Sequence, residues 1–234
     1  MNPVLAALDL DTASAAAAMA ARLRASVGGL KVGSHLFTAE GPEFVRALVR
    51  QGDRVFLDLK FHDIPNTVAA AVRSASRLGV WMLNVHASGG AAMMAAARKA
   101  ADEEAGASGK RPLVIAVTVL TSFDQAALKS LGVERSLESQ VETLATMAQD
   151  AGLDGVVASP LEIAAIRGRC GEKFLIVTPG IRTGAPAPGD DQVRTLSARE
   201  AIDAGASYLV IGRPILRAAD PARAAREIAE EVTK

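Results

Sequence analysis

The amino-acid sequence predicts an α/β fold, a (β/α)8 TIM barrel that forms a single domain over residues 1–234. Short apolar runs of about four to seven residues alternate with longer helical patterns, as expected for buried parallel strands joined by helices. The chain is close to the roughly 250 residues typical of such a barrel. No linker or low-complexity segment divides it. A doubly wound open sheet shares the alternation and is the alternative fold.

Eight apolar runs supply the predicted strands. All are short and rich in Val, Ile and Leu, the composition of strands that are buried on both faces. In chain order they are Val4–Leu10, Leu30–Gly33, Val55–Lys60, Met82–His86, Leu113–Leu120, Gly155–Ser159, Phe174–Thr178 and Tyr208–Gly212.

Helical patterns fill the intervals between these strands. Three of them begin at a proline, which suits the first turn of a helix, and four are followed by a glycine where a left-handed C-cap is expected, at Gly52, Gly79, Gly152 and Gly205. The predicted helices are Ala13–Ala25, Pro42–Arg50, Pro65–Leu78, Gly90–Glu104, Leu137–Ala151, Leu161–Arg167, Ala198–Ala204 and Pro221–Val232. The Gly/Pro-rich stretch Arg182–Gln192 fits neither pattern and predicts a long loop, a type of segment that often carries function.

Composition narrows the class of protein. Half of the residues are hydrophobic and 26 basic side chains balance 26 acidic ones, so the chain can bury a large core and lacks the basic excess usual for nucleic-acid binding. The single cysteine, Cys170, excludes an intrachain disulfide and fits a reducing cytoplasm. The N-terminus does not resemble a signal peptide, and the longest uncharged run, Leu78–Ala97, is too polar for a membrane span. We therefore expect a cytoplasmic protein without nucleic-acid or membrane partners.

Charged side chains gather where the predicted strands end. Asp58 and Lys60 are two residues apart on one strand, so alternation points both toward the barrel mouth and Leu59 toward the helices. Asp63 follows in the next turn, and Lys31 and Asp9 lie on or near the ends of neighbouring strands. An acid–base cluster at the carboxyl ends of barrel strands indicates a catalytic site.

A second group of residues suits a phosphate. Gly212 and Arg213 follow the last strand, where barrels often hold a phosphate with backbone N–H groups and a bidentate arginine. Thr178–Arg182 and the long loop that ends at Gln192 lie on the neighbouring strand connection.

Neither a metal ion nor an organic cofactor is expected. The three histidines lack the usual ligand spacing, and we expect His86 to be a hydrogen-bonded histidine of the barrel. The chain has no G-x-G-x-x-G fingerprint, and the segment GASGK at 106–110 has the wrong spacing for a P-loop.

Nearly the whole chain resembles the bacterial orotidine 5′-phosphate decarboxylase family. The motifs that carry the resemblance are KVG at 31–33, FLDLKFHDIPNTV at 56–68, NVHASGG at 84–90, AVTVLTS at 116–122, VTPGIR at 177–182, DDQVR at 190–194 and IGRPI at 211–215. The family decarboxylates orotidine 5′-monophosphate to uridine 5′-monophosphate, the last step of de novo pyrimidine nucleotide synthesis, without a cofactor.

The resemblance implies a role for each matching residue. Lys60 would protonate C6 of the pyrimidine as carbon dioxide leaves, Asp58 would lie beside the substrate carboxylate, and Lys31 would link the charge network to the ribose. The remaining contacts would come from Asp9 to a ribose hydroxyl, Thr121 to the pyrimidine edge, Arg182 and Gln192 in a closing phosphate loop, and Gly212 and Arg213 at the phosphate. Asp63 and Thr67 would enter the site of a second subunit, so the resemblance implies a homodimer with shared sites.

Two alternatives stay open on the sequence alone. One is a magnesium-dependent barrel similar to 3-keto-gulonate-phosphate decarboxylase or hexulose-phosphate synthase, which shares the D-x-K-x-x-D pattern. The other is a non-catalytic nucleotide-binding barrel. The segment DLKFHDIP and the Thr-Ser pair after the fifth strand favour the decarboxylase of the nucleotide.

Overall fold

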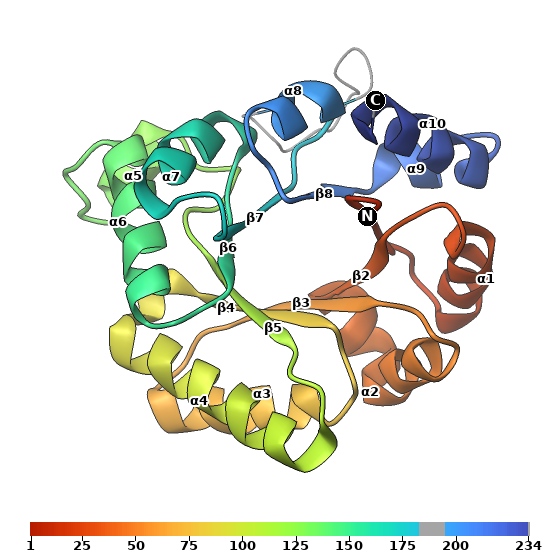
Figure 1. Cartoon of the computed structure of the whole chain (residues 1–234), viewed down its shortest axis with the longest axis horizontal. Coiled ribbons are helices and arrows are strands. Elements are labelled where there is room, and N and C mark those ends of the chain that lie inside the picture. The colour runs from red at the N-terminus through yellow and green to blue at the C-terminus, as the bar shows by residue number, and fades with distance from the viewer. Residues whose placement is uncertain (183–194, 234) are drawn as a thin grey trace.

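A computed structural model describes residues 1–182 and 195–233 of the chain. Eight parallel strands close into a barrel in sequence order, and helices surround it (Figure 1). The barrel closes where β1 pairs with β8, with Val4 opposite Leu209. The predicted (β/α)8 barrel is confirmed, and the open-sheet alternative is excluded.

The strands occupy the predicted positions but several of them are shorter. They are β1 (Val4–Ala7), β2 (Gly29–Gly33), β3 (Val55–Phe61), β4 (Met82–His86), β5 (Leu113–Val117), β6 (Gly155–Val157), β7 (Leu175–Thr178) and β8 (Tyr208–Ile211). Because β1 ends at Ala7 and β5 at Val117, Asp9 and Thr121 lie in the loops that follow these strands.

The helices described in the structure follow the predicted intervals with three differences. They are α1 (Ala13–Leu23), α2 (Ser34–Arg50), α3 (Pro65–Ser76), α4 (Ala91–Ser108), α5 (Gln125–Ser130), α6 (Leu137–Asp150), α7 (Ile163–Cys170), α8 (Ala198–Asp203), α9 (Arg213–Leu216) and α10 (Pro221–Thr233), with short 3-10 turns at Ala87–Gly89 and Pro160–Glu162. Helix α2 begins at Ser34 and bends at Gly41, whose φ is 71°, so the predicted start at Pro42 is wrong. The short helices α5 and α9 were not predicted, whereas positive φ at Gly52, Gly79, Gly152 and Gly205 confirms the predicted C-caps.

Two apolar cores support the barrel. The larger lies between the strands and the surrounding helices, and Leu59 packs against it, as predicted. The smaller consists of Leu5, Phe56, Met82, Ile115 and Val177 from different strands. Phe56 and Met82 are two residues before Asp58 and Asn84, so they share a strand face with these polar residues. The smaller core therefore forms the floor beneath the polar carboxyl end of the barrel.

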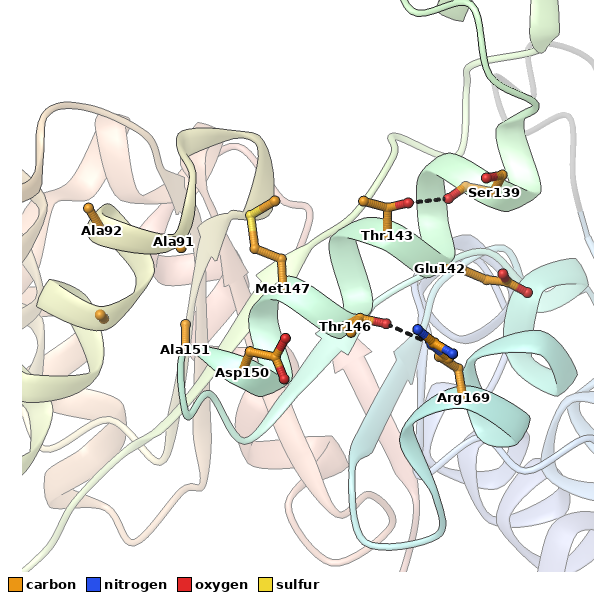
Figure 2. Close-up of a pocket in the computed structure, with 11 residues that line it drawn as sticks. Ala91, Ala92, Ser139, Glu142, Thr143, Thr146, Met147, Asp150, Ala151 and Arg169 are labelled. Carbon is orange, nitrogen blue, oxygen red and sulfur yellow. Dashed lines mark hydrogen bonds between the residues drawn. The ribbon is translucent and has the colours of Figure 1, made fainter.

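A groove on the outer surface lies between α4 and α6 (Figure 2). Arg169 from α7 borders it and donates from Nε to Thr146 Oγ1 at 3.4 Å. The groove is lined by Ala91, Ala92, Ala95, Ser139, Glu142, Thr143, Thr146, Met147, Asp150, Ala151 and Arg169. None of these residues belongs to the charged cluster at the strand ends, so the groove is separate from the predicted site.

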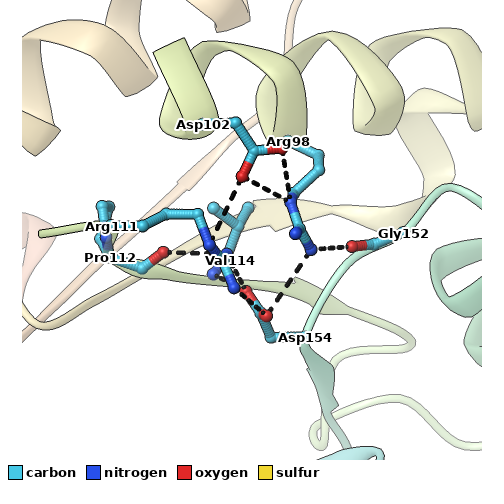
Figure 3. A network of polar contacts seen from close by, with 7 residues as sticks. All are labelled: Arg98, Asp102, Arg111, Pro112, Val114, Gly152 and Asp154. Atoms are coloured by element: carbon cyan, nitrogen blue, oxygen red, sulfur yellow. Dashed lines mark hydrogen bonds and ion pairs between the residues drawn. The ribbon is translucent and has the colours of Figure 1, made fainter. Parts of the chain in front are cut away.

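An ion-pair network lies at the amino ends of the strands, the end of the barrel opposite the predicted site (Figure 3). Asp154 directly precedes β6 and accepts two hydrogen bonds from Arg111, at 2.6 and 2.7 Å, and one from the backbone N–H of Val114 at 2.8 Å. Arg98 of α4 binds Asp102, the carbonyl of Gly152 and Asp154. The network joins β5, β6 and α4 at the amino ends of the strands, far from the predicted site.

Among the described residues, no helix combines the length and the apolar character needed to cross a membrane.

Replacing Asp154 with alanine should lower the free energy of unfolding by about 2–3 kcal/mol. The substitution leaves Arg111, which is mostly buried, without its bidentate partner and removes the acceptor of the Val114 N–H. Urea unfolding followed by circular dichroism measures the change, and kcat of the folded fraction should stay the same.

Glu103→Ala is the matched control, because Glu103 pairs with Arg73 on the surface, where both side chains are partly exposed. Its cost should stay below about 1 kcal/mol. Equal costs for the two variants would contradict a structural role for the Asp154 network.

Candidate active site

A chain of alternating charges lies at the carboxyl end of the barrel. Asp9 Oδ1 is 3.1 Å from Lys31 Nζ, Lys31 Nζ is 3.5 Å from Asp58 Oδ2, and Asp58 Oδ1 is 2.8 Å from Lys60 Nζ. The structure therefore brings together four of the residues that the sequence analysis singled out, from the loop after β1 and from strands β2 and β3.

Burial makes these contacts strong. The side chains of Lys31 and Asp58 are 10% and 13% exposed, while Asp9 and Lys60 are more open to solvent. Burial alone raises the pKa of Asp58, but attraction by Lys31 and Lys60 and hydrogen bonds from Lys60 and Asn84 outweigh it. The pKa of Asp58 therefore lies below its ordinary value, and the carboxylate is ionised at neutral pH.

Lys60 reaches the site through an irregular backbone. Its φ is 52°, the only positive value of a non-glycine residue in the described part of the chain. The pairing of β3 with β4 shifts its register between Leu57 and Phe61, as in a β-bulge. Regular alternation, from which the sequence analysis argued, thus holds as far as Asp58 and fails at Lys60, although the two side chains do meet.

Asn84 is a member of this cluster to which the sequence analysis gave no role. It lies on β4, is fully buried, and donates from Nδ2 to Asp58 Oδ1 at 2.7 Å. Its Oδ1 accepts the backbone N–H of Lys60 at 2.8 Å. One signal was present in the sequence: Asn84 is a polar residue inside an apolar strand, on the face that Met82 turns to the barrel interior.

Two histidines border the cluster. The rings of His62 and His86 lie 5.5 Å apart between centroids. Burial lowers the pKa of His86, His62 and Lys60 lower it further, and Asp58 opposes them, so His86 is neutral at neutral pH. The buried Nδ1 of His86 has no hydrogen-bond partner among the described residues, so the predicted hydrogen bond is wrong for this atom. No group of three or more His, Cys, Asp or Glu residues in the described chain is arranged to hold a metal ion.

Asp63 and Thr67 lie apart from the charge network. Both are exposed, Asp63 in the turn after β3 and Thr67 in the first turn of α3. Asp63 Oδ1 accepts the backbone N–H of Ile64 at 2.6 Å. Ile64, which lies between Asp63 and Thr67 in the sequence, is 67% exposed. This segment therefore presents a carboxylate, a hydroxyl and an apolar side chain outward.

The residues predicted to hold a phosphate follow β7 and β8. Gly212 joins β8 to α9, and a Cβ built on it would lie 3.5 Å from Asp9 Oδ2, so this corner borders the charge network. Arg213 begins α9 and is half-buried. Arg182 follows β7, and its backbone N–H donates to Leu196 at 3.0 Å. Thr121 is half-buried after β5, whereas Gln192 lies outside the described residues.

The fold and the site together define a class of protein. Two ammonium groups held around a buried carboxylate, at the catalytic end of a (β/α)8 barrel, can stabilise a negative charge that develops on a bound substrate. A barrel enzyme that works by electrostatics fits these features.

Comparison with known proteins identifies the family. Residues 2–228 match the model of the orotidine 5′-phosphate decarboxylase / HUMPS family, and the chain belongs to this family. An orotidine 5′-phosphate decarboxylase of Moorella thermoacetica is 54% identical over 99% of this chain and 92% of its own. One from Alkalilimnicola ehrlichii is 54% identical over 97% of both chains. The crystal structure of orotidine 5′-phosphate decarboxylase from Lactobacillus acidophilus superposes with a TM-score of 0.89 at 36% identity and covers both chains in full.

These matches confirm the resemblance derived from the sequence motifs. The family description includes the HUMPS branch as well, but the relatives at 54% identity carry the decarboxylase name. The predicted class, a carboxy-lyase of pyrimidine nucleotide synthesis, is therefore confirmed over the alternative barrel enzymes and over a non-catalytic barrel.

The lowered pKa of Asp58 predicts a specific dependence of stability on pH. Ionised Asp58 is stabilised in the folded state, so its contribution is present above the ordinary value of 3.8 and is lost as the pH falls through the lower, folded value. The gap in unfolding free energy between the wild type and Asp58→Asn should therefore stay constant from pH 7 to about 5 and shrink as the pH falls below about 4. Urea unfolding at each pH measures this gap.

Asp11→Asn serves as the control, because the Asp11 side chain is almost fully exposed. Its effect on stability should be small at every pH. A gap for Asp58→Asn that stays constant or widens at low pH would contradict the electrostatic account.

Proposed function

We propose that this chain decarboxylates orotidine 5′-monophosphate with Lys60 as the proton donor to C6 of the pyrimidine. The observation that carries the proposal is the 2.8 Å contact between Lys60 Nζ and Asp58 Oδ1, in a site where Lys31 also faces Asp58. Family membership supplies the reaction and the substrate.

The chemistry requires such a site. When the C6–carboxylate bond breaks, carbon dioxide leaves and the electron pair remains in an in-plane orbital of C6 that the ring π-system cannot delocalise. Lys60 stabilises this pair by its charge and then donates a proton to C6, which forms uridine 5′-monophosphate. Because the ammonium group is already in place, little reorganisation is needed as the charge develops. Solvent then returns a proton to Lys60.

Asp58 has two functions in this scheme. Its carboxylate accepts a hydrogen bond from Lys60 Nζ at 2.8 Å and so holds the proton donor in place. It also lies beside the substrate carboxylate, and the repulsion between them is relieved when carbon dioxide leaves. The buried position of Asp58 keeps its charge unscreened by water.

The remaining site residues bind the nucleotide. Lys31 and Asp9, which pair at 3.1 Å, face the ribose, and Thr121 faces the pyrimidine edge. Arg182, Gln192, Gly212 and Arg213 hold the phosphate. Phosphate binding far from C6 contributes energy for organising the site around the reacting carbon.

A homodimer with shared active sites completes the proposal. Asp63 and Thr67 are exposed beside Ile64, and in a dimer they would enter the site of the partner, where Asp63 would extend the charge network. Burial of the exposed Ile64 would favour this contact. We also propose that residues 1–234 form one domain and act in the cytoplasm, which fits a chain with one cysteine.

Lys60→Ala should lower kcat by about 10⁴-fold or more, since it removes both the proton donor and the fixed positive charge. The variant should still bind uridine 5′-monophosphate, because the phosphate and ribose contacts remain. The loss of absorbance of orotidine 5′-monophosphate measures turnover, and calorimetry measures binding. Lys99→Ala, at a mostly exposed lysine of α4, is the control and should be fully active. Substantial turnover by purified Lys60→Ala would refute the proton-donor role.

Mixing Lys60→Ala with Asp63→Ala protein should restore activity through hybrid dimers. In a hybrid, the Asp63→Ala subunit supplies Lys60 and its partner supplies Asp63, so one of the two sites is complete. With random exchange, about a quarter of all sites become active. Mixing Lys60→Ala with Lys31→Ala is the matched control and should give no rescue, because both residues act within one subunit. Absence of rescue despite subunit exchange shown by mass spectrometry would contradict shared sites.

A further inference from the structure

We propose that Asn84 is a positioning residue of the active site, whose one side-chain amide holds both the carboxylate of Asp58 and the backbone of Lys60. This inference rests on the proposed function, since it explains how the proton donor and its carboxylate partner are kept in place. Asn84 acts through these two residues rather than on the substrate.

The pairing of β3 with β4 is irregular beside Asn84. Leu57 pairs with Leu83 and Phe61 pairs with Val85. Three residues of β3 therefore face a gap in which β4 supplies only Asn84. The regular ladder cannot reach the N–H of Lys60 there, and Asn84 Oδ1 accepts that N–H at 2.8 Å. The side chain thus replaces a backbone acceptor that the bulge has removed.

The backbone of Lys60 needs such support. Its φ of 52° is costly for a residue with a Cβ, and residues in this region persist where their surroundings hold them. The hydrogen bond from the Lys60 N–H to the fully buried Asn84 is one such restraint. Loss of this bond would let the backbone of Lys60 relax and move its ammonium group away from Asp58.

Asn84 also holds the carboxylate of Asp58. Asp58 Oδ1 accepts from Asn84 Nδ2 at 2.7 Å and from Lys60 Nζ at 2.8 Å, while Oδ2 faces Lys31. The carboxylate plane is therefore fixed from both sides. Asn84 also helps to lower the pKa of Asp58 by donating to its charged form.

Only a neutral group with a donor and an acceptor can make both bonds. An aspartate in this position would give Lys60 its acceptor but would set a second negative charge against Asp58. A leucine of similar size would make neither bond. The partners also settle the orientation of the amide, because its oxygen must face the N–H of Lys60 and its nitrogen the oxygen of Asp58.

These differences define the experiment. Asn84→Asp should lower kcat about 100-fold at pH 8, with the affinity for uridine 5′-monophosphate changed less than about threefold. As the pH falls, the introduced carboxyl takes up a proton and becomes a donor to Asp58 while its other oxygen still accepts from Lys60. Its kcat relative to wild type should therefore rise about tenfold or more toward acidic pH.

Asn84→Leu should lose activity to a similar degree without recovery at low pH. Asn84→Ser replaces it if the leucine variant does not fold. The control is Asn2→Asp at the amino end of the barrel, where Asn2 also bridges a donor and an acceptor by binding Ser26 O and the N–H of Val4, each at 3.0 Å. Asn2→Asp should lower the melting temperature and leave the pH profile of kcat unchanged.

Several outcomes would overturn the inference. One is a kcat within threefold of the wild-type value for both Asn84→Asp and Asn84→Leu. Another is the same dependence of kcat on pH for these two variants. The third is failure of all three Asn84 variants to fold, because Asn84 would then be a determinant of folding alone. None of these outcomes depends on the activity of Lys60→Ala. Loss of this inference therefore leaves the proposed function intact, and a fully active Lys60→Ala would show that the proposed function itself had failed.

Discussion

The ion pair between Asp58 and Lys60 is the contact on which the site depends. A carboxylate that is only 13% exposed costs free energy unless it has partners, and here Lys31, Lys60 and Asn84 all bind it. Each partner approaches Asp58 from a different strand, Lys31 from β2, Lys60 from β3 itself and Asn84 from β4. The shape of β3 and β4 therefore follows from the need to bring these groups to one carboxylate.

The two ends of the barrel have different roles: contacts at the amino end stabilise the fold, and the carboxyl end carries the candidate site. At the amino end, the bidentate contact of Arg111 with Asp154 joins neighbouring strands in a regular ladder. At the carboxyl end, β3 leaves its ladder with β4 and Lys60 takes a strained backbone conformation. Between them, Phe56 and Met82 form part of an apolar floor. The regular pairing at the amino end supports a carboxyl end that holds backbone strain and buried charge.

Much of the fold could be predicted from sequence, because parallel strands buried on both faces are nearly continuous apolar runs. The error at α2 arose because Gly41 and Pro42 resemble a helix start, whereas they form a bend within one helical segment. Asp58, Lys31 and Asp9 could be placed from strand ends alone. The conformation of Lys60 and the role of Asn84 could not be predicted in this way, since both depend on how β3 pairs with β4. A bulge that depends on the pairing of two strands produces no repeating pattern in the sequence.

The charge balance of the buried cluster suits the proposed reaction. Lys31, Asp58 and Lys60 together carry one net positive charge, and Asp9 lies at the more exposed edge. Binding of the substrate carboxylate neutralises this excess. In the proposed reaction, loss of carbon dioxide would move the negative charge only from the carboxylate to the adjacent C6, and proton transfer from Lys60 would then remove it. A neutral amide at Asn84 is the partner that orients Asp58 without altering this balance, whereas any ionised group there would shift the charge that the carbanion meets.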